Sequence, residues 1–156
     1  MASTRAASTQ REGYAPGLVS VAVDGGELDR ERVVAEVRAA FEQYERDLVA
    51  NDVDALVAWF WDDPRAVRYG IDEMHLGHDA IAEYRRSQAQ ATPPRQLRNT
   101  WITTFGDDVA IADTEFVPEG TAGADVVGRQ SQTWVRFPVG WRIVSAHVSW
   151  LSGQRP

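Results

Sequence analysis

A regular stripe of apolar residues between positions 33 and 48 is the clearest pattern in the chain. Its members recur at intervals of three and four residues, the spacing of one face of an α-helix: Val33, Val37, Phe41, Tyr44 and Leu48. We expect Asp29 to cap the start of this helix. The same spacing turns Tyr44 toward the interior, where a core aromatic with its hydroxyl bonded to the backbone is the simplest interpretation.

A second, shorter helix is predicted directly after the first. Asn51 suits a left-handed helix end, and Asp52 can begin the next helix. Pro64 cannot continue a helix and pushes Asp63 toward extended geometry, so the second helix ends before it. The apolar face of this helix consists of Val53, Leu56, Val57 and Phe60.

Residues 65–69 alternate as a β-strand does, and the residues from Gly70 to Glu73 indicate a turn. Alternation places Ala66 and Arg68 on one face and Arg65 on the other. A strand that enters the core here can carry one arginine inward, either Arg68 or Arg65. A buried guanidinium is rarely unpaired, so the inward arginine needs an anion. A structural ion pair is the ordinary alternative to a ligand, with Asp62, Asp113 or Glu115 as partner.

A third helix follows a short return strand at residues 74–76. We expect it to begin between Gly77 and Asp79, with Ile81, Tyr84 and Gln88 on its inner face. Consecutive prolines at positions 93 and 94 prevent any continuation.

The second half of the chain changes to the pattern of β-strands. Four runs rich in Thr, Val, Ile and Trp cover residues 97–105, 109–117, 127–137 and 141–151, with turn residues between them. This series predicts an antiparallel meander. Helices with a small hairpin, followed by long strands, predict an α+β domain in which a curved sheet wraps around a helix.

Both faces of the long strands mix polar and apolar side chains. A sheet with one solvated face would show a cleaner alternation. We therefore expect one face to line a polar pocket and the other face to meet a second copy of the protein, which would cover the surplus tryptophan surface. The sequence thus predicts a homodimer.

Composition narrows the possible chemistry. The 156 residues include no cysteine, and all 16 basic residues are arginines. Cysteine nucleophiles, thiolate metal sites and Schiff-base lysines are therefore excluded. A net charge of −7 argues against nucleic-acid or anionic-membrane binding. No apolar run approaches the roughly 20 residues that span a bilayer.

The chain is expected to form one domain, residues 29–152, after a flexible leader, residues 1–28. The leader lacks the pattern of a secretory signal, which favours a cytoplasmic protein. Within the leader, residues 18–23 are a candidate for pairing with an edge strand or with a partner subunit.

The histidines are weak signals for catalysis. His147 alternates with apolar residues in the last strand, where a hydrogen-bonded core histidine is more common than a catalyst. His75 and His78 flank a turn and a helix start, and with Asp79 they are too few and too local to predict a metal site. The sequence contains no Ser-His-Asp order, phosphate loop or glycine fingerprint.

Several longer strings resemble one known family. The helix start at residues 77–81 and the ending at residues 140–149 resemble the SnoaL-like branch of the cone-shaped NTF2-like fold, named after nuclear transport factor 2. Other strings resemble the AtzH-like family, the 1,3-dicarboxyurea decarboxylases of cyanuric acid breakdown: residues 41–45, 60–70, 97–100 and 128–136. The resemblance runs from about Glu36 to Ser149.

The resemblance implies an NTF2-like cone, with three N-terminal helices wrapped by a curved, mainly antiparallel sheet. It also implies a decarboxylase in which Tyr44 and Arg68 convert 1,3-dicarboxyurea to allophanate. Loss of carbon dioxide from an N-carboxylate requires the carboxylate to be held and desolvated, and requires a proton for the nitrogen. Arg68 can bind one carboxylate and Tyr44 can supply the proton.

No metal or organic cofactor is expected in this chemistry, because the departing nitrogen is conjugated to a carbonyl group. Further residues are candidates for binding the small dianionic substrate: Asn99, Arg129, Gln130, Gln132 and His147.

Two other classes of function stay open. The protein could be a non-catalytic partner of an amidase, because relatives that resemble this family are associated with amidase systems. The cone fold also hosts isomerases and dehydratases that use a carboxylate base or a His-Asp pair, for which His147 and Asp113 are the candidates here.

Overall fold

The elements predicted from the sequence appear in the expected order in a computed structural model, which describes residues 28–88, 91–120 and 126–151. The first half contains α1 (Glu31–Ala50), α2 (Val53–Ala58), β1 (Val67–Tyr69), β2 (Met74–Leu76) and α3 (His78–Ser87). The second half contains β3 (Arg95–Phe105), β4 (Val109–Pro118), β5 (Gly128–Phe137) and β6 (Gly140–Trp150). The predicted pairing of residues 18–23 lies outside the described residues.

The apolar stripe of α1 is buried as its spacing predicts. Its five members are at most 5% exposed. The helix ends at Asn51, which has left-handed dihedrals of φ 53° and ψ 38°, a conformation that asparagine tolerates. The side chain of Asp52 then accepts a hydrogen bond from the backbone N–H of Ala55 at 3.0 Å and caps α2.

The predicted helix cap at Asp29 is wrong. Arg30 occupies the position before α1 and makes no side-chain cap. Asp29 instead adopts a positive φ of 49° and exchanges hydrogen bonds with Thr104 on β3, since its carboxylate accepts from the Thr104 N–H at 2.9 Å. Thus Asp29 ties the start of α1 to the edge strand of the sheet.

The chain crosses from α2 into the sheet through a short parallel pairing. The backbone N–H of Trp61 donates to the carbonyl of Ile143 at 3.0 Å, and the N–H of Ile143 donates to the carbonyl of Trp59 at 2.8 Å. After the turn at Pro64, β1 pairs in parallel with β6, with Arg68 opposite Ala146. Ala66 and Arg68 share one face, as alternation predicts, and both are buried, so Arg68 rather than Arg65 is the inward arginine.

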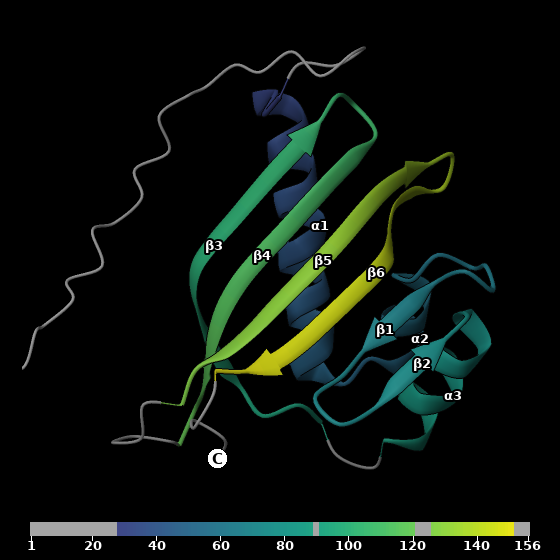
Figure 1. The fold of residues 1–156 in the computed structure, drawn as a ribbon, viewed down its shortest axis with the longest axis vertical. Coiled ribbons are helices and arrows are strands. Elements are labelled where there is room, and N and C mark those ends of the chain that lie inside the picture. The colour runs from purple at the N-terminus through teal and green to yellow at the C-terminus, as the bar shows by residue number, and fades with distance from the viewer. Residues whose placement is uncertain (1–27, 89–90, 121–125, 152–156) are drawn as a thin grey trace, which may run out of the picture.

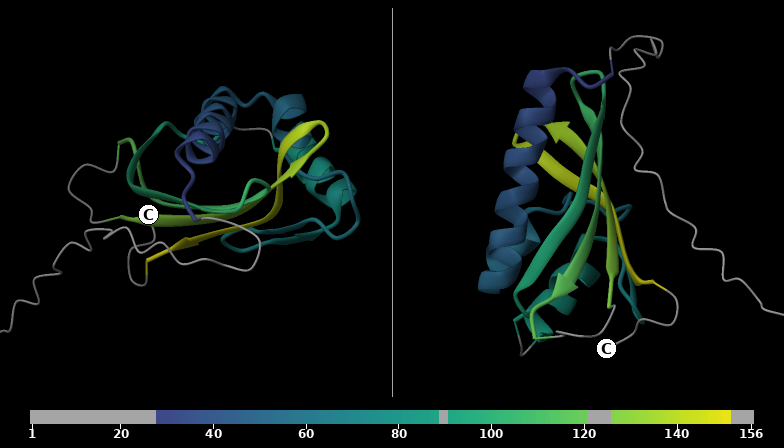
Figure 2. Two further views of the ribbon diagram at one scale, coloured as in Figure 1. Left: turned by 90° about the horizontal axis from the view of Figure 1, so that it is seen from above. Right: turned by 90° about the vertical axis from the view of Figure 1, so that its left-hand side faces the viewer.

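The described strands form one curved sheet in the order β2-β1-β6-β5-β4-β3. The four long strands are an antiparallel meander, as predicted. Figures 1 and 2 show α1 lying across one face of this sheet, while α2, α3 and the β1–β2 hairpin lie beside β6. We call the face toward α1 the concave face and the opposite face the convex face.

The core fills the space between α1 and the concave face. Phe41, Phe60, Trp134 and Ile143 are each at most 1% exposed. No helix in the described part of the chain is both long enough and apolar enough to cross a membrane.

The inner face of α3 differs from the prediction at its end. Ile81 is fully buried and Tyr84 is half-buried, but Gln88 is the exposed residue that follows the helix. Arg85 takes the inward position instead and is 7% exposed. Arg85 follows Ile81 by four residues, so it lies on the same helix face.

Candidate active site

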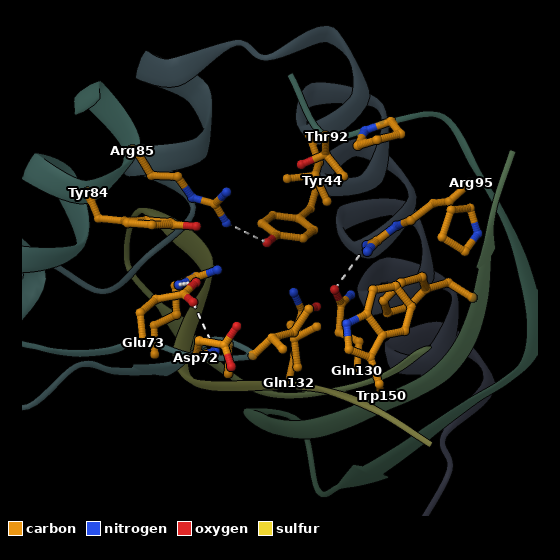
Figure 3. A pocket seen from close by; sticks show the side chains of 18 of the residues that line it. Tyr44, Asp72, Glu73, Tyr84, Arg85, Thr92, Arg95, Gln130, Gln132 and Trp150 are labelled. Carbon is orange, nitrogen blue, oxygen red and sulfur yellow. Dashed lines mark hydrogen bonds and ion pairs between the residues drawn. The ribbon is translucent and has the colours of Figure 1, made fainter. Parts of the chain in front are cut away.

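A cavity of about 560 Å³ lies between the concave face, α1 and α3 (Figure 3). This volume is within the range of small-molecule sites, about 300–1,000 Å³. Side chains from α1, α3, the β1–β2 turn and strands β4 to β6 line the cavity, together with residues around the start of β3. Both halves of the chain are therefore needed to form it.

Tyr44 reaches the cavity from the inner face of α1. Its ring meets the indole of Trp134 edge-on, with ring centroids 6.4 Å apart. Its hydroxyl accepts a hydrogen bond from Nη2 of Arg85 at 3.1 Å, which Figure 3 shows as a dashed line. The hydroxyl therefore meets a guanidinium rather than the backbone.

Arg68 is the inward arginine of β1 and also lines the cavity. It is 8% exposed, and its Nη1 donates to Oε1 of Glu73 at 3.0 Å. The acid partner is thus Glu73 from the following turn rather than any of the three acids proposed from the sequence. The guanidinium also lies over the ring of Tyr84, 4.3 Å from the ring centroid, a favourable cation–π geometry.

Arg68, Glu73 and Tyr84 influence one another's protonation in this part of the cavity. Burial raises the pKa of the Glu73 carboxyl, but hydrogen bonds from Arg68 and from the backbone of Asp72 outweigh burial, so the pKa lies below its usual value. Burial raises the pKa of the Tyr84 hydroxyl, and the charge of Glu73 adds to this effect. Glu73 is therefore ionised and Tyr84 protonated near neutral pH.

Arg85 is the residue of this site that the sequence analysis missed. A charged residue between Glu83 and Arg86 on a helix is usually interpreted as solvent-exposed. For this reason Arg85 was not assigned to the apolar face from the sequence. The signal that could have found it is the interval of four residues from Ile81. We call the group formed by Tyr44, Arg68, Tyr84 and Arg85 the arginine–tyrosine cluster.

The opposite side of the cavity holds a closed polar network. Arg95 donates to the carboxylate of Glu45 from Nε at 3.0 Å and from Nη2 at 2.7 Å. Gln130 joins both partners: its Oε1 accepts from Arg95 at 2.9 Å and its Nε2 donates to Glu45 at 2.8 Å. The charge of Arg95 is therefore matched by an acid, and Gln130 holds α1 against β3 and β5.

Of the ligand-binding residues predicted from the sequence, Gln130 and Gln132 line the cavity, together with Tyr44 and Arg68. Gln132 is 1% exposed, and neither its amide nitrogen nor its amide oxygen has a hydrogen-bond partner. Arg129 alternates with Gln130 along β5, so it is exposed on the convex face. The prediction that Arg129 lines the same pocket is wrong.

His147 lies on the convex face because β6 contains a bulge. Thr133 pairs with Ser145 and Trp134 pairs with Ile143, which leaves Val144 as an extra residue. A bulge reverses the alternation beyond it, so His147 no longer shares a face with Ile143. It is exposed and lines a separate hollow with Asp113. This pair therefore cannot act inside the main cavity.

Asn99 is excluded from the cavity for the same kind of reason. The register of β3 shifts between Arg98 and Trp101, and Asn99 adopts a left-handed φ of 50° within this bulge. Its side chain is exposed and donates to Glu115 at 2.8 Å. Three of the five predicted binding residues thus belong to the convex face.

The profile of the AtzH-like family matches residues 26–154. The chain belongs to the AtzH-like family. Two solved structures are also similar over most of the chain. The AtzH-like chain is 47% identical to a protein of unknown function from the DUF3225 family of Pectobacterium atrosepticum SCRI1043, with a TM-score of 0.75 and coverage of 80% of this chain and 95% of that chain.

A second similar structure is a cystatin-like fold protein from Burkholderia xenovorans LB400, at 45% identity and a TM-score of 0.76, covering 85% of this chain and all of that chain. An NTF2-like protein from Pseudomonas putida KT2440 is 18% identical with a TM-score of 0.65, covers 81% of this chain and 94% of that chain, and shows the fold alone. A comparison with curated proteins found no match. The NTF2-like α+β fold of this AtzH-like chain, with its curved sheet, is confirmed.

Proposed function

We propose that this AtzH-like protein is a decarboxylase of N-carboxylated ureas, with 1,3-dicarboxyurea as the substrate and allophanate as the product. The observation that supports the proposal most is the arginine–tyrosine cluster: a phenol whose hydroxyl contacts one guanidinium, in a cavity that a second guanidinium also lines. Such a site can hold a carboxylate away from bulk water and offers a proton beside it.

The chemistry follows from these groups. The bond between the carboxylate carbon and its nitrogen breaks, and its electron pair stays on the nitrogen. Tyr44 donates its proton to this nitrogen, and the carboxylate leaves as neutral carbon dioxide. Arg85 stabilises the resulting phenolate, because a positive charge at hydrogen-bond distance favours the charged form of its partner. Water then returns the proton to Tyr44.

Arg68 has a different part in the proposed reaction. Its contact with Glu73 uses one nitrogen, so the other nitrogens can hold a substrate carboxylate. The departing nitrogen is conjugated to the urea carbonyl, which accepts part of the developing negative charge. The reaction therefore needs a positioned proton donor and fixed positive charge more than it needs an electron sink.

The test is the release of carbon dioxide from freshly generated 1,3-dicarboxyurea. Arg68→Ala should abolish turnover, and Tyr44→Phe should lower kcat about 10²-fold or more, the contribution expected of a general acid. Matched controls are Arg65→Ala and Tyr69→Phe, since both side chains are exposed on the same segment of chain. Both control variants should retain the wild-type rate.

Two outcomes would contradict the proposal. Normal turnover in both Tyr44→Phe and Arg68→Ala would remove the cluster from the reaction. Tight binding of a urea carboxylate by the wild-type protein without carbon dioxide release would favour the accessory role beside an amidase, in which the cavity presents a ligand without converting it.

A further inference from the structure

Three arginines line the cavity, and their partners differ. Arg68 pairs with Glu73 at 3.0 Å, and Arg95 pairs with Glu45 through two nitrogens. Arg85 donates to the hydroxyl of Tyr44 and lies 5.8 Å from the ring centroid of Tyr84. No carboxylate of the described residues pairs with it. Arg85 therefore carries the one guanidinium charge of the described cavity wall without an acid partner.

An unpaired buried charge is costly, because desolvation is not offset by a partner. Arg85 is 7% exposed, and its Nε–H has no hydrogen-bond partner. Within the described parts of the chain, no acid balances this charge. A ligand carboxylate in the cavity would balance it and would restore bidentate pairing to the guanidinium.

Gln132 is the second unpaired group of the cavity wall. Its neighbours across both adjacent strands are alanines, Ala112 on β4 and Ala146 on β6. Small neighbours offer no hydrogen-bond partner and leave space over the amide. Gln130 lies two residues earlier on the same face. In contrast to Gln132, both of its amide atoms have hydrogen-bond partners, Arg95 and Glu45.

A buried amide without a hydrogen-bond partner destabilises the fold, because its desolvation is not offset, so such groups in native proteins need an explanation. One side-chain amide presents a donor and an acceptor side by side. A planar carbonyl next to an N–H, as in an amide or a urea, presents the complementary acceptor and donor.

We propose that Arg85 and Gln132 are the ligand-selecting pair of this cavity, and that they select a carboxylate attached to an amide or urea group. Arg85 binds the carboxylate, and Gln132 pairs with the edge formed by the carbonyl and the N–H. Figure 3 shows both side chains pointing toward the centre of the cavity, beside Tyr44. The choice of a urea as the ligand group rests on the proposed function, but the inference that Arg85 and Gln132 act together does not.

The experiment compares the equilibrium binding of two inert ligands of the same shape. N-carbamoylglycinate carries a carboxylate and a urea, and 4-methylpentanoate replaces every urea atom with carbon. Calorimetric titration of both ligands is carried out with the wild type and with Arg85→Gln, Gln132→Met and Arg86→Gln. Arg86 is the matched control, because it neighbours Arg85 on α3 and is exposed.

The wild type should bind N-carbamoylglycinate about tenfold or more tightly than 4-methylpentanoate, the factor that one hydrogen-bonded pair supplies. Gln132→Met should abolish this preference. Arg85→Gln should weaken both ligands by a similar factor of about ten or more, because it removes the carboxylate partner that they share. Arg86→Gln should match the wild type.

Thermal unfolding separates a binding role from a structural role. Replacing a side chain that has no partner by an apolar one of similar shape removes an unsatisfied group. Gln132→Met should therefore keep or raise the unfolding temperature while it removes selectivity. A structural glutamine would instead lower the unfolding temperature when replaced.

Three results would overturn the inference: wild-type protein that binds neither ligand, a ligand preference that survives in Gln132→Met, or an Arg85→Gln variant that binds as Arg86→Gln does. These results are distinct from failure of the decarboxylase proposal, because the ligands cannot lose carbon dioxide. Selective binding without turnover of 1,3-dicarboxyurea would overturn the reaction alone, and turnover without this selectivity would overturn the inference alone.

Discussion

At the scale of single residues, the surroundings of each arginine decide what it can do. Arg95 is held by Glu45 and Gln130 and stabilises the domain. Arg68 shares its charge with Glu73, which is one-third exposed and can give way to a ligand. Arg85 has no acid partner among the residues that the structure describes. The same residue type thus has three different sets of partners within one cavity.

His75 makes the stability of the folded protein depend on pH. Its ring packs against that of Tyr84 with a tilt of 32° and centroids 4.3 Å apart, and its buried Nε2 has no hydrogen-bond partner among the described residues. Burial lowers the pKa of His75, the charges of Arg68 and Arg85 lower it further, and Glu73 acts in the opposite direction. The folded protein therefore binds this proton less readily than the unfolded chain does.

We predict that the free energy of unfolding falls as the pH falls below the ordinary histidine pKa of about 6.5 and toward the lower folded value. Because folding lowers the pKa of His75, its contribution to the free energy of unfolding is fully present above the pKa of the unfolded chain. This contribution is lost as the pH falls toward the folded pKa. His75→Gln should reduce this loss and should leave the stability near pH 8 similar. Urea unfolding at several pH values measures the effect, and equal pH slopes in both proteins would contradict it.

The inward direction of Tyr44 is predictable from the helical stripe, whereas strand alternation leaves Arg65 and Arg68 as alternatives and only the family resemblance selects Arg68. The partners of Arg85 and Gln132 are not predictable in this way. Whether a buried polar group has a partner depends on neighbours from distant strands, such as the alanines opposite Gln132. Local patterns contain no information about such neighbours.

At the scale of elements, two bulges decide which side chains reach the cavity. Alternation from Trp141 and Ile143 along β6 predicts His147 on the concave face, but the extra residue at Val144 moves Ala146 there instead. Helices, strands and their order follow from the hydrophobic pattern. The strand register does not, because a single inserted residue reverses every later side chain and leaves little trace in composition.

The bulge of β3 can be tested at Asn99. A β-branched residue in the left-handed region costs about 1–2 kcal/mol, whereas glycine adopts it freely. Asn99→Val should lower the free energy of unfolding by about that amount relative to Asn99→Gly. Denaturant unfolding of both variants measures the difference. Equal stabilities would show that the backbone relaxes and that the positive φ of 50° is not required.

At the scale of the whole molecule, the convex face remains open for association. One row of paired residues crosses it from β3 to β1: Trp101, Asp113, Ser131, His147 and Tyr69. Trp101 is 48% exposed and Tyr69 is 43% exposed. Large exposed aromatics on a polar strand face are typical of interfaces.

We predict that the protein forms a homodimer through this row. Trp101→Glu should give a monomer at micromolar concentration, because it places a charge in the centre of the interface. Val139→Glu is the control, since Val139 is 71% exposed in the turn between β5 and β6, away from the row. Sedimentation equilibrium measures the mass. A monomeric wild type, or a dimeric Trp101→Glu variant, would contradict the prediction.

The parallel pairing of β1 with β6 has a consequence for how the protein is made. Arg68 on β1 lies beside Ala146 on β6, so a ribosome must release the chain through β6 before that side of the pocket can close. Until then the nascent polypeptide exposes the guanidinium of Arg68 to water. A ligand of the pocket can therefore bind there only after β6 has been synthesised and has paired with β1.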